Sequence, residues 1–331
     1  MPKESPPITH MTGESLVLAH EEPGKLLLRN VDSRSVVVRS TYLAGDPKSV
    51  KYAPGQDYVI DAEIGTIART AHSRIPDFSK NVLYGKKDFD HGNYPGYGNL
   101  PFTIFVDYDA ADAIELTTPT DASPQLPKTT EKLRSGKPLK IIAYGDSITA
   151  GGEASSVELQ FPSRWAQALQ KRYPKSQITL ENGATGGDST ENGLARLQEK
   201  VLSRHPDLVL IAFGMNDHNL ISVGGVPIPK FKQNLKSIAT QIREKTGAEV
   251  ILLSTFPPNP DWHYGSHQME KYAEATKQAA QELNAPYADV YDLWMKVQAR
   301  KDPPSLLGNN INHPNDFGHW LYLQALESLR L

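Results

Sequence analysis

Four residues that could take part in acyl transfer occur in order along the chain. Ser147 lies in a Gly-Asp-Ser segment, Gly187 in a glycine-rich turn, Asn216 in a Gly-Met-Asn-Asp segment, and His313 directly before a proline. A serine hydroxyl can act as a nucleophile with a histidine as its general base. Backbone N–H groups and an asparagine amide can stabilise the oxyanion that develops. These residue types are therefore candidates for a serine hydrolase site.

Each motif also has a purely structural interpretation when it stands alone. A serine after a strand often caps a helix, a glycine turn often supplies a positive φ, and asparagine favours turns. The chain has no cysteine, which excludes a thiolate nucleophile, a disulfide framework and cysteine-ligated metals. Any covalent catalysis must use another nucleophile, for which Ser147 is a candidate.

From residue 139 onward, strand-like runs alternate with segments of helical periodicity. The runs are LKIIAY, ITLEN, DLVLIAF, EVILLSTF and YADVYD. This alternation predicts an α/β fold in which helices cover both faces of a parallel sheet. Ligands of such sheets bind beyond the carboxyl ends of the strands. Ser147, Gly187 and Asn216 each follow one of these ends, so we expect them to lie close together.

The first part of the chain has a different pattern. LLLRNV, SVVVRSTYL, DYVIDAE, GTIAR and FTIFVDY are rich in β-branched and aromatic residues and are separated by turn formers. They predict a smaller antiparallel β-sandwich over residues 1–116. Residues 117–138 are rich in Thr, Pro and Lys and predict an inter-domain linker or a surface crossover. The second domain would then cover residues 139–331.

The order Ser, Gly, Asn and His resembles that of the SGNH (GDSL) hydrolase superfamily over residues 139–331. The resemblance implies a flavodoxin-like three-layer domain that hydrolyses carboxylic esters through an acyl-enzyme. It implies that Ser147 is the nucleophile and His313 the general base. The Ser147 N–H, the Gly187 N–H and the Asn216 side chain would form the oxyanion hole. A jelly-roll-like domain before the hydrolase is similar to two-domain carbohydrate esterases, which remove acetyl groups.

The chain departs from this family three residues before the histidine, where most members carry aspartate and this chain has Asn310. Three alternatives follow. In the first, Ser147 and His313 form a catalytic dyad, and a backbone carbonyl or the Asn310 side chain orients the ring. In the second, a displaced carboxylate, Asp302 or Asp316, completes a triad. In the third, the domain binds its ligand without catalysis. A dyad predicts modest rates that rise as the imidazole loses its proton.

The segment after the fourth predicted hydrolase strand offers candidate substrate contacts. Trp262, His263 and Tyr264 combine aromatic faces with polar edges, which suits a sugar ring better than an acyl chain. The alternative is a surface loop pinned by a buried tryptophan. A similar Tyr/His/Gly-rich stretch, residues 91–97, either reaches over the site or only forms a loop. A general short-chain carboxylesterase or lipase-like enzyme, and a vestigial glycan-binding protein, are the competing functions.

Composition narrows the class of partner. The formal charge of −3 gives no basic footprint for nucleic acid or an anionic membrane. No apolar run reaches the roughly 18–20 residues of a membrane span, and the first residues lack the apolar core of a signal peptide. We therefore expect a soluble protein, cytoplasmic unless a leader has been removed. We expect no cofactor and no metal, because no ligand spacing such as H-E-x-x-H occurs. The oligomeric state is not predicted.

Overall fold

The computed structural model describes residues 8–331, and its first part consists of antiparallel sheets. One sheet has the strand order β1-β7-β3-β4 and the other the order β2-β6-β5. The strands are β1 (Ile8–Leu16), β2 (Gly24–Lys25), β3 (Val37–Arg39), β4 (Lys51–Tyr52), β5 (Tyr58–Asp61), β6 (Thr66–Arg69) and β7 (Ile104–Ile114). An additional antiparallel domain is thus confirmed, whereas its jelly-roll connectivity stays a prediction.

Two segments of this part differ from the sequence-based expectation. Strand β1 was not among the predicted runs, because a register shift around Gly13, which has a φ of +68°, interrupts its alternation. The apolar run at Leu26–Leu28 is buried but is not a strand. Its backbone N–H groups donate to side chains: Leu27 to the Glu14 carboxylate at 2.8 Å and Leu28 to the Tyr108 hydroxyl at 3.1 Å. Burial alone therefore does not make a strand here.

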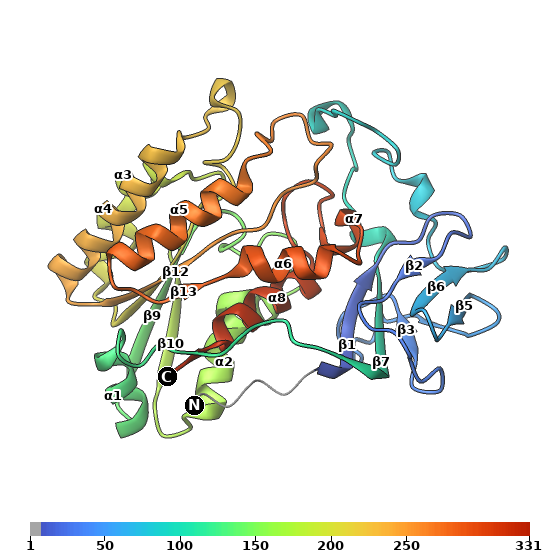
Figure 1. Cartoon of the computed structure of the whole chain (residues 1–331), viewed down its shortest axis with the longest axis horizontal. Coiled ribbons are helices and arrows are strands. Elements are labelled where there is room, and N and C mark those ends of the chain that lie inside the picture. The colour runs from blue at the N-terminus through green and yellow to red at the C-terminus, as the bar shows by residue number, and fades with distance from the viewer. Residues whose placement is uncertain (1–7) are drawn as a thin grey trace.

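The second part is a five-stranded parallel sheet between helices, as Figure 1 shows. The strand order is β10-β9-β11-β12-β13. The strands are β9 (Leu139–Gly145), β10 (Ile178–Asn182), β11 (Leu208–Ala212), β12 (Glu249–Leu253) and β13 (Tyr287–Ala288). The predicted α/β class and parallel sheet are confirmed.

Two groups of helices pack around this sheet. The first group is α3 (Thr190–Lys200), α4 (Ile228–Thr246) and α5 (Met269–Glu282). The second group is α2 (Phe161–Arg172), α6 (Val290–Gln298) and α8 (Asp316–Glu327), with the short α7 (Pro303–Leu306) before α8. Each long helix buries an apolar stripe, as in α4, whose inward positions are Phe231, Leu235, Ile238 and Ile242. This packing holds the carboxyl ends of the strands at one edge of the sheet.

Residues 117–138, predicted as an inter-domain linker or a surface crossover, contain regular secondary structure. They form β8 (Thr120–Asp121), which pairs in parallel with β14 (Leu329–Arg330), and helix α1 (Pro127–Ser135). The few apolar side chains of the segment, Ala122, Leu126 and Leu133, are all buried. The carboxylate of Glu249 accepts two N–H groups of the first turn of α1. Few apolar residues suffice here because all three are buried.

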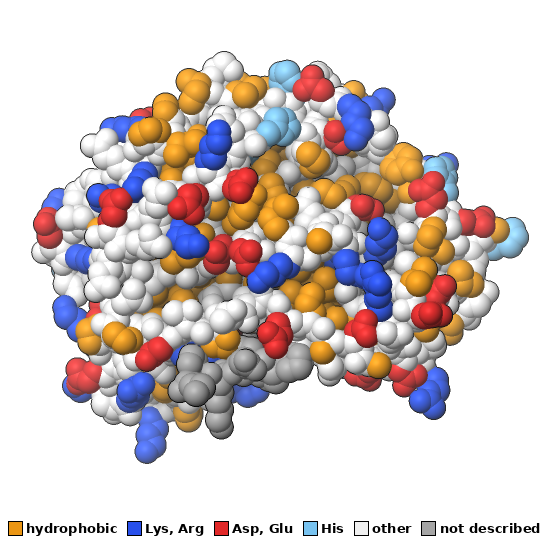
Figure 2. All heavy atoms as spheres, in the orientation of Figure 1, with side chains coloured by type: hydrophobic (Ala, Val, Ile, Leu, Met, Phe, Trp, Pro, Cys, Tyr) orange, Lys and Arg blue, Asp and Glu red, His pale blue; other side chains and the backbone are white. Residues whose placement is uncertain are grey.

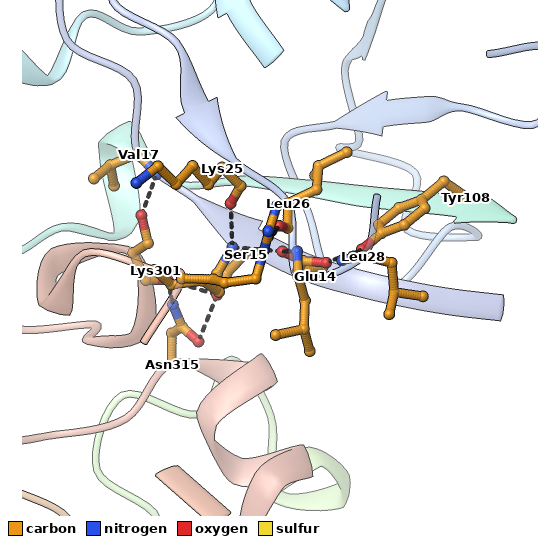
Figure 3. Close-up of polar contacts among 12 residues, drawn as sticks. Glu14, Ser15, Val17, Lys25, Leu26, Leu28, Tyr108, Lys301 and Asn315 are labelled. Carbon is orange, nitrogen blue, oxygen red and sulfur yellow. Dashed lines mark hydrogen bonds and ion pairs between the residues drawn. The ribbon is translucent and has the colours of Figure 1, made fainter. Parts of the chain in front are cut away.

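A single apolar core runs from the antiparallel sheets into the parallel-sheet domain. Polar contacts cross the same boundary, as Figure 3 shows. Lys301 Nζ lies 2.5 Å from Glu14 Oε1, and both side chains are completely buried. The Tyr108 hydroxyl donates to the other Glu14 oxygen at 2.5 Å. Burial lowers the pKa of Lys301 and raises that of Tyr108. The two parts of the chain therefore pack as one body.

The same boundary reaches the segment that carries His313. Ser15 Oγ donates to the Ser305 carbonyl at 2.6 Å and lies 3.2 Å from Asn315 Oδ1. Asn315 in turn donates to the Ser305 carbonyl and caps α8, because its Oδ1 accepts the N–H groups of Phe317 and Gly318. Strand β1 thus contacts the cap of the helix that begins three residues after His313.

On the surface, positive and negative side chains are interspersed over the face drawn in Figure 2. Within residues 8–331, no helix has the length and apolar character that crossing a membrane requires.

Candidate active site

The structure brings Ser147 and His313 into direct contact. Ser147 follows β9, His313 precedes α8, and His313 Nε2 lies 2.8 Å from Ser147 Oγ. Both residues are partly exposed, so a substrate can reach them. The turn before the histidine is fixed by Asn309, whose Oδ1 accepts the backbone N–H groups of Ile311, Asn312 and His313. A hydroxyl within hydrogen-bond reach of an imidazole is the arrangement that nucleophile activation requires.

Gly187 and Asn216 lie in the turns that follow the neighbouring strands β10 and β11. Gly187 has a φ of +78°, which favours glycine. Its turn is attached to the end of β9 by the Thr185 N–H, which donates to the Gly145 carbonyl at 3.1 Å. Asn216 Nδ2 donates to the Asp188 carbonyl at 3.0 Å, which orients the amide, and this nitrogen carries a second N–H. Both residues therefore follow strands that flank β9, the strand that precedes Ser147.

Asp146 and Asp217, which neighbour the serine and the asparagine, act as structural supports. Asp146 Oδ1 accepts the Ile148 N–H at 3.0 Å, and Asp217 accepts the Thr190 N–H at 2.9 Å. Burial raises the pKa of Asp146 to about 6 and that of Asp217 to about 7. Their contacts shape the turns that present the reactive groups.

Asn310 does not orient the imidazole in the structure. The residue is buried with a φ of +59°, and its backbone and side-chain oxygens lie 2.9 and 3.3 Å from Asn259 Nδ2. It lines a cavity of about 450 Å³ between the two parts of the chain. The suggested role of its side-chain oxygen as the orienter of His313 is therefore wrong, because the left-handed backbone turns that side chain toward another loop.

The two displaced carboxylates that we considered do not reach the ring either. Asp302 is exposed at the start of α7 and lines the same cavity as Asn310. Asp316 is buried, and its Oδ1 accepts the Ser155 N–H at 2.9 Å. A different carboxylate approaches the imidazole: Glu153 Oε1 lies 4.0 Å from His313 Nδ1. The sequence signal for Glu153 is weak and consists of the two glycines before it, which permit close approach of the backbone.

The loop that follows β12 contacts two segments of the site. The Asn259 N–H donates to the Ile311 carbonyl at 2.7 Å, and the Leu220 N–H donates to the Tyr264 carbonyl at 2.9 Å. The loop therefore contacts the segment before His313 and the segment after Asn216.

Trp262, His263 and Tyr264 in this loop have different environments. Trp262 is only 6% exposed, and its Nε1 lies 3.1 Å from His91 Nδ1. Its burial corrects the expectation that the ring faces a sugar, since the tryptophan pins the loop. His263 is exposed and lies 2.8 Å from the Asp88 carboxylate, and Tyr264 is half-buried. Contact of His263 and Tyr264 with a substrate stays a prediction.

The segment around residues 91–97 reaches this loop from the antiparallel part, at the top of Figure 1. The Phe89 N–H donates to the Asp261 carbonyl at 2.8 Å, and the Asn99 N–H donates to the Gly308 carbonyl at 2.7 Å. The first part of the chain thus contributes to the rim beside the histidine. Within residues 8–331, no group of three or more His, Cys, Asp or Glu side chains is placed to hold a metal ion.

Residues 143–321 match the GDSL-like Lipase/Acylhydrolase family, and the chain belongs to this family. The matched residues include Ser147, Gly187, Asn216 and His313. The family resemblance expected from the sequence is thus confirmed.

Three of the relatives that match part of this chain are named as esterases. An arylesterase of Vibrio mimicus is 36% identical over 121 residues, which cover 36% of this chain and 56% of the relative. Esterase TesA of Pseudomonas aeruginosa is 33% identical over 44% of this chain and 67% of the relative. An acetylxylan esterase of Geobacillus stearothermophilus is 24% identical over 59% of this chain and 94% of the relative. The chain thus spans little more than half of the arylesterase.

A solved structure with a similar fold is a two-domain esterase (CEX) active on acetylated mannans, which was co-crystallized with mannopentaose. The TM-score is 0.52 at 22% identity, and the match covers 63% of this chain and 54% of that chain. At this identity the likeness concerns the fold alone.

Proposed function

We propose that this protein is a serine esterase that removes short acyl groups, acetyl above all, from carbohydrates. The observation that carries the proposal is the 2.8 Å contact between His313 Nε2 and Ser147 Oγ beside the Gly187 and Asn216 turns. A hydroxyl, a base and oxyanion donors are what acyl transfer requires.

The proposed reaction has two steps. Ser147 Oγ attacks the ester carbonyl carbon while His313 Nε2 takes the hydroxyl proton. The Ser147 and Gly187 N–H groups and the Asn216 amide stabilise the oxyanion. Collapse breaks the ester C–O bond, and the imidazolium returns the proton to the leaving alcohol. Water, deprotonated by the same imidazole, then attacks the acyl-enzyme and releases the acid and free Ser147.

Support for a saccharide substrate comes from aromatic residues at the rim. His91, Tyr94, Tyr97 and Tyr264 are all partly exposed and surround the buried Trp262. The His91 ring centre lies 5.5 Å from that of Tyr97 and 6.0 Å from that of Tyr264. Aromatic rings with polar edges suit the apolar faces and hydroxyls of sugars. The acetylxylan esterase relative points in the same direction.

The proposal is tested by measuring acetate release from acetylated xylan, from acetylated xylooligosaccharides and from p-nitrophenyl acetate in parallel. We expect hydrolysis of acetylated saccharides, and we expect the Ser147→Ala variant to show almost no turnover. A series of p-nitrophenyl esters defines the acyl length. Preference for eight or more carbons would instead support a lipase-like enzyme, and glycan binding without turnover a vestigial one. Turnover of p-nitrophenyl acetate alone would support a general short-chain esterase.

A further inference from the structure

We propose that Glu153 positions the imidazole of His313 and replaces the carboxylate that Asn310 does not supply. The inference rests on the proposed function, in which His313 is the general base. Glu153 Oε1 lies 4.0 Å from His313 Nδ1, the nitrogen that does not contact the serine. His313 Nε2 lies 2.8 Å from Ser147 Oγ. Acid, base and nucleophile therefore occur in the order of a catalytic triad, with an acid from an unexpected position.

The backbone before Glu153 is built for close approach to the ring. A Cβ atom on Gly152 would lie 2.8 Å from His313 Nδ1 and 3.1 Å from the Ser147 carbonyl oxygen. The Gly152 N–H donates to that carbonyl at 2.8 Å. A side chain at this position would therefore displace the imidazole. Glu153 itself has a φ of +64°, an unfavourable conformation for a residue with a Cβ atom.

Helix α8 holds the turn of Glu153 in place. The Gly152 carbonyl lies 3.2 Å from His319 Nε2, and the Ser155 N–H donates to Asp316 Oδ1 at 2.9 Å. Both partners belong to α8, which begins three residues after His313. One buried helix thus fixes the acid and the base relative to each other, and the strained φ persists because both flanks are held.

Gly308 completes the packing between the two residues. Its N–H donates to the His313 carbonyl at 2.9 Å. A Cβ atom on Gly308 would lie 2.4 Å from Glu153 Cβ, so the absence of a side chain makes room for the glutamate. The Glu153 side chain is 31% exposed and that of His313 is 22% exposed. The carboxylate is therefore partly solvated, and its effect is weaker than that of a buried acid.

This placement has a defined chemical consequence. An anion beside Nδ1 favours the tautomer with a proton on Nδ1, which leaves the Nε2 lone pair directed at Ser147. It also stabilises the imidazolium that forms when Nε2 takes the serine proton. A distance of 4.0 Å is longer than a hydrogen bond, and such contacts commonly tighten once the ring becomes charged.

The decisive comparison is Glu153→Gln against Glu158→Gln, which removes the same charge from an exposed turn of the same loop. With p-nitrophenyl acetate, we expect Glu153→Gln to lower kcat about 10- to 100-fold with KM within about twofold, less than the ~10⁴ of a buried triad acid. The acid limb of the kcat/KM profile is expected to move to lower pH, because the imidazole loses a nearby anion. Asp146 and His319 also act on the ring and are retained.

The variant Glu153→Gly distinguishes a loss of imidazole positioning from a loss of stability. Glycine relieves the positive φ, so we expect this variant to be at least as heat-stable as the native chain. Its kcat is nevertheless expected to fall as in Glu153→Gln. Equal activity of Glu153→Gln and Glu158→Gln would overturn the proposal. The proposal would also be overturned if Glu153→Gln lowered kcat while the acid limb of its kcat/KM profile stayed at the same pH as in the native chain. Absence of hydrolysis by the native chain would contradict the proposed function itself, and the role of Glu153 with it.

Discussion

Three residues around the site have backbone conformations that cost free energy or demand a special residue. Gly187, Glu153 and Asn310 have φ values of +78°, +64° and +59°. Glycine adopts such values freely and asparagine tolerates them, whereas glutamate does not. Strain of this kind persists only where the surrounding contacts hold it, and it concentrates at functional sites. The conformations of Glu153 and Asn310 decide which of these two side chains faces His313.

At Asn216, the amide is expected to act mainly in the transition state. The variant Asn216→Ala removes an oxyanion donor, so we expect kcat to fall about 10²–10³-fold with a small change in KM. Steady-state kinetics with p-nitrophenyl acetate measures both parameters, with Ser147→Ala as the inactive reference. A fall in kcat of less than threefold would show that the amide does not contact the oxyanion.

Asn310→Asp tests the direction of that side chain. The substitution restores the aspartate that most family members carry, but the side chain lies next to Asn259 and not next to His313. We therefore expect kcat/KM at neutral pH to change by less than about threefold, because a charge whose contact is elsewhere leaves the imidazole largely unaffected. A tenfold gain in kcat/KM would mean that the side chain at this position reaches the ring.

At the scale of elements, the site is assembled from the ends of strands and the starts of helices. Helix α3 begins after Ser189, which forms a capping box with Asn192. The Asp217 carboxylate accepts the N–H of Thr190 at the same helix start. Because Asp217 follows Asn216 directly, this contact joins the turn of Asn216 to the turn that contains Gly187. The Asp217 carboxylate thus fixes these turns, although its burial removes it from water and costs free energy.

Asp217 gives stability a pH dependence whose sign follows from its raised pKa. Burial raises the pKa to about 7 in the folded chain, from about 3.9 in an unfolded chain, so the folded state holds this proton more tightly. Its contribution to stability is complete below about pH 4 and is lost as the pH rises through about 7. Relative to the native chain, Asp217→Asn is expected to gain stability over this window, by at most about 4 kcal/mol.

Urea unfolding of both proteins at several pH values between 4.5 and 7.5 measures this difference. Buried histidines such as His218 and His319 have lowered pKa values and act with the opposite sign. They are common to both chains, so the difference reports on Asp217 and on Asp146, whose charge raises the pKa of Asp217. Unfolding free energies that stay parallel over the whole window would contradict the assignment.

At the scale of the whole molecule, the antiparallel part belongs to the structure of the site. One apolar core crosses the boundary, and buried polar contacts join β1 to the segments before and after His313. The Asn99 N–H also donates to the carbonyl of Gly308, and the N–H of Gly308 donates to the carbonyl of His313. The segment that carries His313 is therefore held by contacts from both parts of the chain.

The buried Glu14–Lys301 pair provides the test at this scale. Glu14→Gln leaves the Lys301 ammonium buried without a counter-charge, so we expect a loss of about 3–5 kcal/mol in unfolding free energy. Chemical denaturation measures the loss, and a single cooperative transition is expected. Asp32→Asn, which removes an exposed carboxylate beside Arg34, is the matched control and is expected to change stability little. Equal stability of the two variants would mean that the pair does not hold the boundary.

Much of this architecture can be predicted from local patterns. The alternation of strands and helices after residue 139 identifies the parallel sheet, because a periodicity of apolar residues reports directly on burial. The motifs of Ser147, Gly187 and Asn216 also follow from strand-end position and residue type, and the motif of His313 from the proline after it. Strand β1 and helix α1 were missed, because a glycine bulge breaks the alternation in one and the other carries few apolar residues.

The amino-acid sequence alone determined the reactive residue types, their order and the sheet that presents them, since each depends on neighbours a few positions away. The tertiary structure decided which carboxylate faces His313, where Asn310 points, and that Trp262 is buried. It also decided that the antiparallel part supports the histidine segment. These features depend on contacts between segments far apart in the chain, and the direction of a side chain there is set by packing that no local pattern encodes.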